Sequence, residues 1–165
     1  PIDVGVTVRA VGAGDIDDDG AVEIVAGTYE GSGNPARVIC MTPDGVEEWT
    51  YNTLDGVTQL VIGETCGTGS LEVHVTDYSG NLYILKADGT ELFTYDLGGN
   101  TYYYYTSPLG LGDVDGDNWL EVVVTAHDDA GVYAFKGPLP PAEFPSYTIA
   151  LVAALAVLYL ALRRE

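Results

Sequence analysis

The amino-acid sequence predicts an all-β fold of three repeated, four-stranded antiparallel sheets, the third incomplete, followed by a C-terminal hydrophobic α-helix. Three observations support this prediction. Apolar residues make up 47% of the 165 residues, and 21 Gly and 8 Pro suit short strands joined by tight turns. A block of sequence recurs with a spacing of 49 residues. Near the C-terminus, 16 consecutive residues carry no charge.

The repeated block begins at Gly14, Gly63 and Gly112. Each copy consists of a loop, a strand-like run and a turn, and the runs are residues 22–26, 71–75 and 120–124. Alternating and β-branched apolar residues in these runs favour strands.

The remainder of the unit also repeats, because residues 37–45 match residues 81–89 and both end in an Asp-Gly pair typical of a hairpin turn. Strands with aromatic residues at matched places follow at 46–51 and 90–95. Residues 57–62 and 101–106 are expected to form the inner strands of the second and third units. Four short strands in 49 residues match one β-propeller blade. The sequence therefore predicts a propeller-type domain over residues 1–137, with blades at about 7–55, 56–100 and 101–137.

The predicted domain is unfinished, because the third unit lacks its fourth strand and propellers usually close with about 4 to 8 blades. Residues 1–6 could add an outer strand to the first unit. Exposed sheet edges favour pairing with another chain. Three arrangements remain open: a homo-oligomer formed through these edges, further blades upstream in a longer precursor, or a stacked row of blades.

The loops that open the first and third blocks predict calcium sites. Ca²⁺ takes about 6–8 oxygen ligands, and alternate side chains of a tight loop converge on one point. Position 6 holds Gly20 or Asn118, which tolerate a positive φ. The expected ligands are side chains at positions 1, 3, 5 and 9 and the carbonyl at position 7: Asp15, Asp17, Asp19, Ala21 and Glu23, and Asp113, Asp115, Asp117, Trp119 and Glu121.

An EF-hand does not fit these loops. Its position 12 requires a bidentate Glu, whereas Ala26 and Val124 stand there, and the flanking segments are β-rich. The middle loop keeps Gly69 at position 6 but has Glu64, Cys66, Thr68, Ser70 and Glu72 at the ligand positions. We expect this loop to fold without metal or to bind it weakly.

The pattern G-D-x-D-x-D-G-x-x-E-[IV]-V resembles the FG-GAP repeats of integrin-like β-propellers and related surface proteins. This resemblance implies calcium bound with a structural role in an outer hairpin of each blade, and surfaces used for adhesion or ligand binding. The chain departs from the family in its middle loop, in having Glu rather than Asp at position 9 and in its low number of blades.

The C-terminal segment predicts a membrane anchor. A Pro-rich linker at 138–146 precedes the uncharged stretch 147–162, and Arg-Arg-Glu follows at 163–165. Extended upstream, the apolar stretch gives roughly 28 Å of helix, close to the minimum that spans a bilayer. The arginines favour the cytoplasmic side. Packing of such helices within an oligomer is the alternative. Residues 142–145 and the helix resemble archaeal PEF-type sorting tails, which implies a surface protein whose tail is usually removed on anchoring.

The net charge of −19 excludes nucleic acid as a plausible partner, because this surface repels a phosphate backbone. Cys40 and Cys66 fit either one disulfide or two unpaired thiols. His74 alternates with apolar residues on a strand, which indicates a structural role. The sequence has no Gly-rich phosphate loop, nucleophile elbow or zinc spacing, so we do not expect an enzyme.

The sequence favours a calcium-stabilised extracellular protein that assembles into a sheath, filament or surface layer and is membrane-anchored at its C-terminus. The first alternative is an anchored adhesion module for a glycan or protein ligand. The second is a non-catalytic segment of a surface enzyme.

Overall fold

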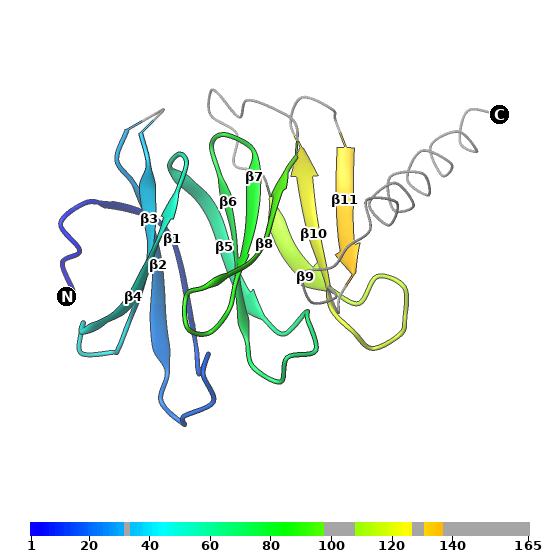
Figure 1. The fold of residues 1–165 in the computed structure, drawn as a ribbon, viewed down its shortest axis with the longest axis horizontal. Helices are drawn as coiled ribbons and strands as arrows, with labels where there is room; N and C mark the ends of the chain where they lie inside the picture. The colour runs from blue at the N-terminus through cyan, green and yellow to red at the C-terminus, as the bar shows by residue number, and fades with distance from the viewer. Residues whose placement is uncertain (32–33, 98–107, 127–130, 137–165) are drawn as a thin grey trace.

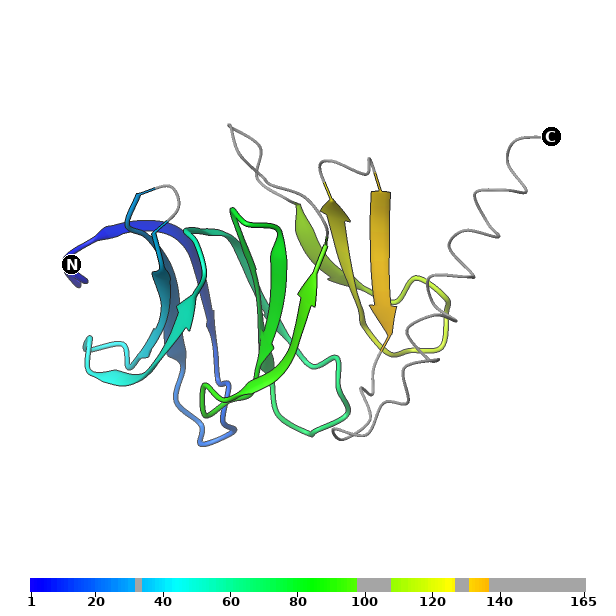
Figure 2. The same ribbon diagram turned by 45° about the horizontal axis from the view of Figure 1, so that its top comes forward.

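The computed structural model describes residues 1–31, 34–97, 108–126 and 131–136, which form eleven strands and no helix. The strands make three antiparallel sheets that stand in a row in chain order (Figures 1 and 2). The first is β1 (Thr7–Gly14), β2 (Glu23–Tyr29), β3 (Ala36–Met41) and β4 (Glu47–Thr53). The second is β5 (Val57–Gly63), β6 (Glu72–Asp77), β7 (Asn81–Leu85) and β8 (Glu91–Asp96). The third is β9 (Leu109–Gly112), β10 (Glu121–Ala126) and β11 (Gly131–Lys136).

The all-β prediction and its repeat are confirmed for the described residues. The glycines that open the repeated blocks are the last residues of β1, β5 and β9, and the following strand pairs antiparallel in each sheet. The predicted inner strand at 101–106 lies outside the described residues. In the third sheet, β9 pairs with β10 as β5 pairs with β6 in the second. β9 lies close to the position found by adding the 49-residue repeat to β5.

The sheets pack face to face through two apolar cores. Val25, Val38 and Val57 are completely buried in the core between the first two sheets. Leu82 and Val124 are equally buried in the core between the second and third. The first strands also touch, β1 with β5 and β5 with β9. Neighbouring sheets therefore meet along their inner strands, as blades of a propeller do.

Glycines allow this close approach. A Cβ added to Gly27 would lie 2.4 Å from Val57 Cγ1, and one on Gly63 would lie 2.3 Å from Leu111 Cδ1. At Gly27 the Cβ of Val57 would also lie within 2.9 Å, so a side chain there requires movement of the neighbouring sheet, whereas at Gly63 the end of the Leu111 side chain can turn away. Gly27 thus sets the distance between the first two blades.

The matched aromatic residues of the outer strands join neighbouring sheets. Trp49 of β4 donates its Nε1–H to the Ala87 carbonyl at 2.8 Å. Tyr95 of β8 lies edge-on to Phe135 of β11, with ring centroids 5.0 Å apart. Aromatic pairs in this geometry add to the energy of apolar burial. The repeat of aromatics therefore corresponds to a repeat of sheet-to-sheet contacts.

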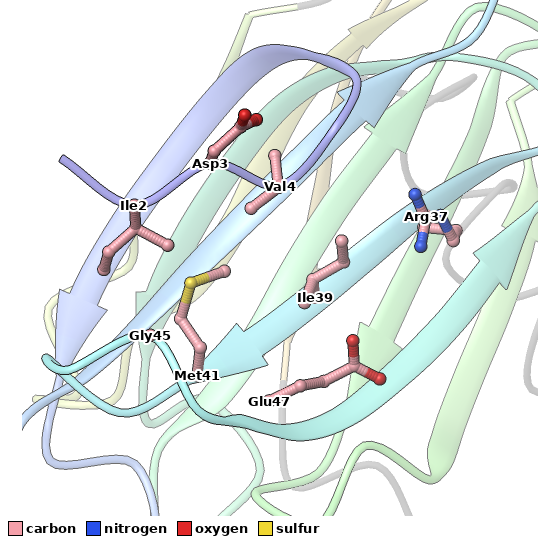
Figure 3. A pocket seen from close by; sticks show the side chains of 8 residues that line it. All are labelled: Ile2, Asp3, Val4, Arg37, Ile39, Met41, Gly45 and Glu47. Atoms are coloured by element: carbon pink, nitrogen blue, oxygen red, sulfur yellow. The ribbon is translucent and has the colours of Figure 1, made fainter.

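Residues 1–6 form no strand, so the outer strand suggested for them is absent. They pass over the outward face of the first sheet, where Val4 packs on Ala26, Ile39 and Met41. A pocket of about 180 Å³ lies beneath them (Figure 3), and its lining is Ile2, Asp3, Val4, Arg37, Ile39, Met41, Gly45 and Glu47.

Cys40 and Cys66 are not joined by a disulfide and lie in different apolar cores. Burial, aided by a hydrogen bond to Glu48, raises the pKa of Cys40 to about 12. Both thiols pack as apolar groups.

The linker at 138–146, the predicted helix at 147–162 and the end at 163–165 lie outside the described residues. Among the residues that are described, none belongs to a helix with the length and apolarity needed to span a bilayer.

Candidate metal loops

The three repeated loops connect β1 to β2, β5 to β6, and β9 to β10, and all lie at the same end of the sheets (Figure 1). The antiparallel ladders run up to the loops, since the register pairs Gly14 with Glu23 and Gly112 with Glu121. Each ladder therefore holds both ends of an acidic loop close together.

In the first loop, backbone N–H groups donate hydrogen bonds to the aspartate carboxylates. Asp15 accepts the N–H of Asp19 and of Gly20, each at 3.0 Å. Asp17 accepts the Asp19 N–H at 3.2 Å, and Asp19 accepts the Ala21 N–H at 2.7 Å. Successive Asx turns thus point the carboxylates at positions 1, 3 and 5 to the inside of the loop.

The third loop repeats this pattern of hydrogen bonds. Asp113 accepts the N–H of Asp117 at 3.1 Å and of Asn118 at 2.9 Å. Asp115 accepts the Asp117 N–H at 3.2 Å, and Asp117 accepts the Trp119 N–H at 2.9 Å. Two loops 98 positions apart in sequence therefore share the same pattern of hydrogen bonds from backbone N–H groups to aspartate carboxylates.

The Glu at position 9 closes every loop from within the sheet. Glu23 accepts the Ile16 N–H at 2.9 Å, and Glu121 accepts the Val114 N–H at 2.8 Å. In the middle loop Glu72 accepts the Thr65 N–H at 2.8 Å. All three glutamates are buried, with at most 2% of their surface exposed.

The residues present fit a bound cation. Oxygens of Asp15, Asp17 and Asp19 lie within 4.8 Å of one another, as do oxygens of Asp113, Asp115 and Glu121. Glu121 Oε1 is buried and has no hydrogen-bond partner among the described residues. A buried carboxylate oxygen without a partner is costly. A cation held between Glu121 and the two aspartates supplies the missing contact, and a set of hard oxygens suits Ca²⁺ or Mg²⁺.

In the middle loop, both carboxylate oxygens of the buried Glu72 accept hydrogen bonds from residues of the loop itself. Thr68 at position 5 donates its hydroxyl to Glu72 Oε1 at 2.5 Å, the oxygen that corresponds to the unpartnered one of Glu121. His74, completely buried, lies 2.8 Å from the Thr65 hydroxyl through Nε2. At position 5 a neutral hydroxyl thus occupies the place that a carboxylate has in the other two loops.

A lysine contacts the third loop. Lys136 Nζ forms ion pairs with Asp115 and, at 2.6 Å, with Asp117. This contact lowers the pKa of Asp117 below its usual value. Both partners are roughly half exposed, so solvent screens the attraction.

The expected positive φ at position 6 is confirmed, with φ of 91° at Gly20, 82° at Gly69 and 72° at Asn118. Position 4 is also left-handed, with 63° at Asp18 and 83° at Gly116. Sequence analysis did not identify this requirement. The glycines at position 4 of the second and third loops were the available signal.

The structure brings together only part of each predicted ligand set. Glu23 is outside the carboxylate group of the first loop, and Asp117 is outside that of the third. Both lie in their loops but bond to a backbone N–H or to Lys136 instead. The carbonyls of Ala21 and Trp119 remain predicted ligands.

No family model matches this chain, and no curated protein matches it. Among solved structures, the chain is similar to BBS1N, a β-propeller-type domain, in the crystal structure of its complex with ARL6DN, soaked with lead. The match has a TM-score of 0.52 and 13% identity, and covers 82% of this chain and 41% of that chain. The chain thus corresponds to less than half the length of this neighbour. At this identity the likeness concerns the fold alone, and the three sheets have a β-propeller-type architecture with two acidic loops able to hold a metal ion.

Proposed function

We propose that this chain is a calcium-stabilised extracellular surface protein that assembles with copies of itself and is anchored to the membrane by residues 147–162. The proposal that the protein binds calcium rests on Glu121 Oε1, which is buried and has no hydrogen-bond partner among the described residues. Oxygens of Glu121, Asp113 and Asp115 lie within 4.8 Å of one another. The role of the metal is structural. It neutralises carboxylates that otherwise repel one another at the end of the sheets.

Calcium binding is tested by isothermal titration of metal-free protein and by thermal unfolding with calcium or with chelator. We expect two bound ions per chain. At about 100 times Kd, each stabilises the fold by about 2.7 kcal/mol. Asp15→Asn and Asp113→Asn should each remove one ion. Glu64→Gln, at the same position of the middle loop, is the matched control and should remove none.

Absence of binding, or equal unfolding temperatures with calcium and with chelator, would contradict the structural role. Loss of an ion in Glu64→Gln would contradict the prediction that only the first and third loops bind calcium.

Assembly is supported by the third sheet and the loop between β9 and β10, which carry one exposed valine each. Val132 is 69% exposed and Val114 is 59% exposed. Their counterparts in the second sheet, Leu82 and Thr65, are buried. A face built like a blade interface but without a neighbouring blade among the described residues suits contact with a second copy.

The surface location and the anchor are supported by the sequence of the tail and by the resemblance to FG-GAP repeats. Electron microscopy of native material, with and without chelator, tests them together with assembly. Ordered, membrane-associated particles that dissolve on chelation are the expected result. A strict monomer that binds a glycan would instead favour the adhesion module, for which the pocket of Figure 3 is the candidate site.

A further inference from the structure

The third acidic loop has an ion pair with a lysine. Lys136, the last residue of β11, stands opposite Glu121 in the ladder, so its side chain leaves the sheet beside the third loop. Its ammonium group contacts Asp115 and Asp117, two of the predicted calcium ligands.

No such contact is made to the first loop by the residues that the structure describes. There the ladder pairs Ile24 with Met41, and the residue after β3, Thr42, stands where the third sheet has Lys136. Thr42 is neutral, and its hydroxyl accepts the Val46 N–H at 3.2 Å within its own hairpin. The first loop thus keeps three aspartates grouped within 4.8 Å, with no lysine at the equivalent position.

The second sheet supplies an internal comparison. Its ladder pairs Val73 with Leu85, which places Lys86 at the position equivalent to Lys136. The loop beside Lys86 has Cys66 and Thr68 where the third loop has aspartates. A lysine at this place therefore meets two aspartates only in the third blade.

We propose that Lys136 is a built-in counter-ion that competes with calcium for the third loop. The proposal rests on the proposed function, in which both acidic loops bind calcium. A divalent ion must displace Nζ from Asp115 and Asp117 before both carboxylates can ligate it. The third loop consequently binds calcium more weakly than the first, and its carboxylates are partly neutralised when no calcium is present.

Lys136 does not complete the site by itself. The oxygens that gather in the third loop belong to Asp113, Asp115 and Glu121, and with Lys136 in place Glu121 Oε1 has no hydrogen-bond partner in the described part of the chain. The ammonium therefore neutralises the outer carboxylates and leaves the inner, buried ligand to the metal.

The test is calcium titration of the full chain in an Asp15→Asn background, so that the signal comes from the third loop. Lys136→Gln should tighten binding roughly tenfold, because each ion pair is exposed and modest in strength. Lys86→Gln is the matched control and should leave the affinity unchanged. In the reciprocal test, Thr42→Lys in an Asp113→Asn background should weaken the first loop by a similar factor.

Metal-free stability gives an independent readout. With chelator present, Lys136→Gln should unfold at a lower temperature than the parent, whereas saturating calcium should remove the difference. Unchanged third-loop affinity in Lys136→Gln would overturn the inference while leaving the proposed function intact. Absence of calcium binding in both single-loop backgrounds would overturn the two together.

Discussion

Asp18 adopts a left-handed backbone, with φ of 63°, at a position where the other two loops have glycine. A Cβ in this region costs about 1–2 kcal/mol, and Asp tolerates it better than most residues. We expect Asp18→Gly to be at least as stable as the parent and Asp18→Ala to be less stable than Asp18→Gly by about 1–2 kcal/mol. Urea unfolding of the three proteins in chelator measures both differences. Equal stability of the two variants would contradict a conformational role for position 4.

His74 has no exposed surface, and burial lowers its pKa from 6.5 to about 4. The unfolded chain therefore binds a proton below pH 6.5 that the folded chain does not bind until about pH 4. Stability falls as the pH drops through this window and is fully present above it. About 2.5 pH units at 1.36 kcal/mol each give a loss of about 3 kcal/mol.

His74→Leu should flatten this dependence between pH 6.5 and 4, as measured by unfolding in chelator at several pH values. Other groups contribute a background slope, since burial raises the pKa of Asp77 and so acts in the opposite direction. The difference between parent and variant isolates the histidine. An identical slope in both proteins would exclude His74 as the titrating group.

Strand packing depends on glycines at the points where sheets meet. Gly27→Ala places a methyl group 2.4 Å from Val57 Cγ1, so the first two sheets must move apart. We expect a loss of about 1–3 kcal/mol in the free energy of unfolding. Gly110→Ala on β9 is the control, because a Cβ there meets nothing within 4 Å. Similar losses in both variants would mean that strand propensity, rather than contact between sheets, determines the effect.

The outer strands carry a second repeated contact. Tyr51 of β4 lies edge-on to Tyr83 of β7, with centroids 5.6 Å apart, and at the matched positions Tyr95 of β8 lies 6.4 Å from Tyr133 of β11. Each blade thus presents aromatics from its last strand to the third strand of the next blade. Among the described residues no further sheet packs on the third one, which leaves Val132 exposed.

The arrangement of blades predicts how copies of the protein associate. Val132→Asp introduces a charge on the outward face of the third sheet and should shift the protein towards smaller species in sedimentation velocity. Val46→Asp is the control, since Val46 is 63% exposed in a hairpin turn of the first sheet. An unchanged size distribution in Val132→Asp would show that assembly uses another surface.

The sequence predicted the repeat, the order of the strands and the two acidic loops, because these depend on local pattern. Periodicity identifies strands, Asp-Gly pairs identify turns, and alternate carboxylates identify a loop that surrounds an ion. The inner strand that the structure describes in the third blade is β9, which begins at Leu109, whereas the strand predicted at 101–106 lies outside the described residues.

Three features depended on contacts between distant residues. Lys136 reaches Asp115 and Asp117 because the β10–β11 ladder carries it across the sheet to the third loop. Glu121 Oε1 lacks a partner within the described ranges because position 5 is Asp117 here, whereas Thr68 donates to Glu72 in the middle loop. Residues 1–6 cover the first sheet rather than extend it. Local pattern determines which groups each loop offers, whereas the packing of strands determines which charges and hydroxyls those groups meet.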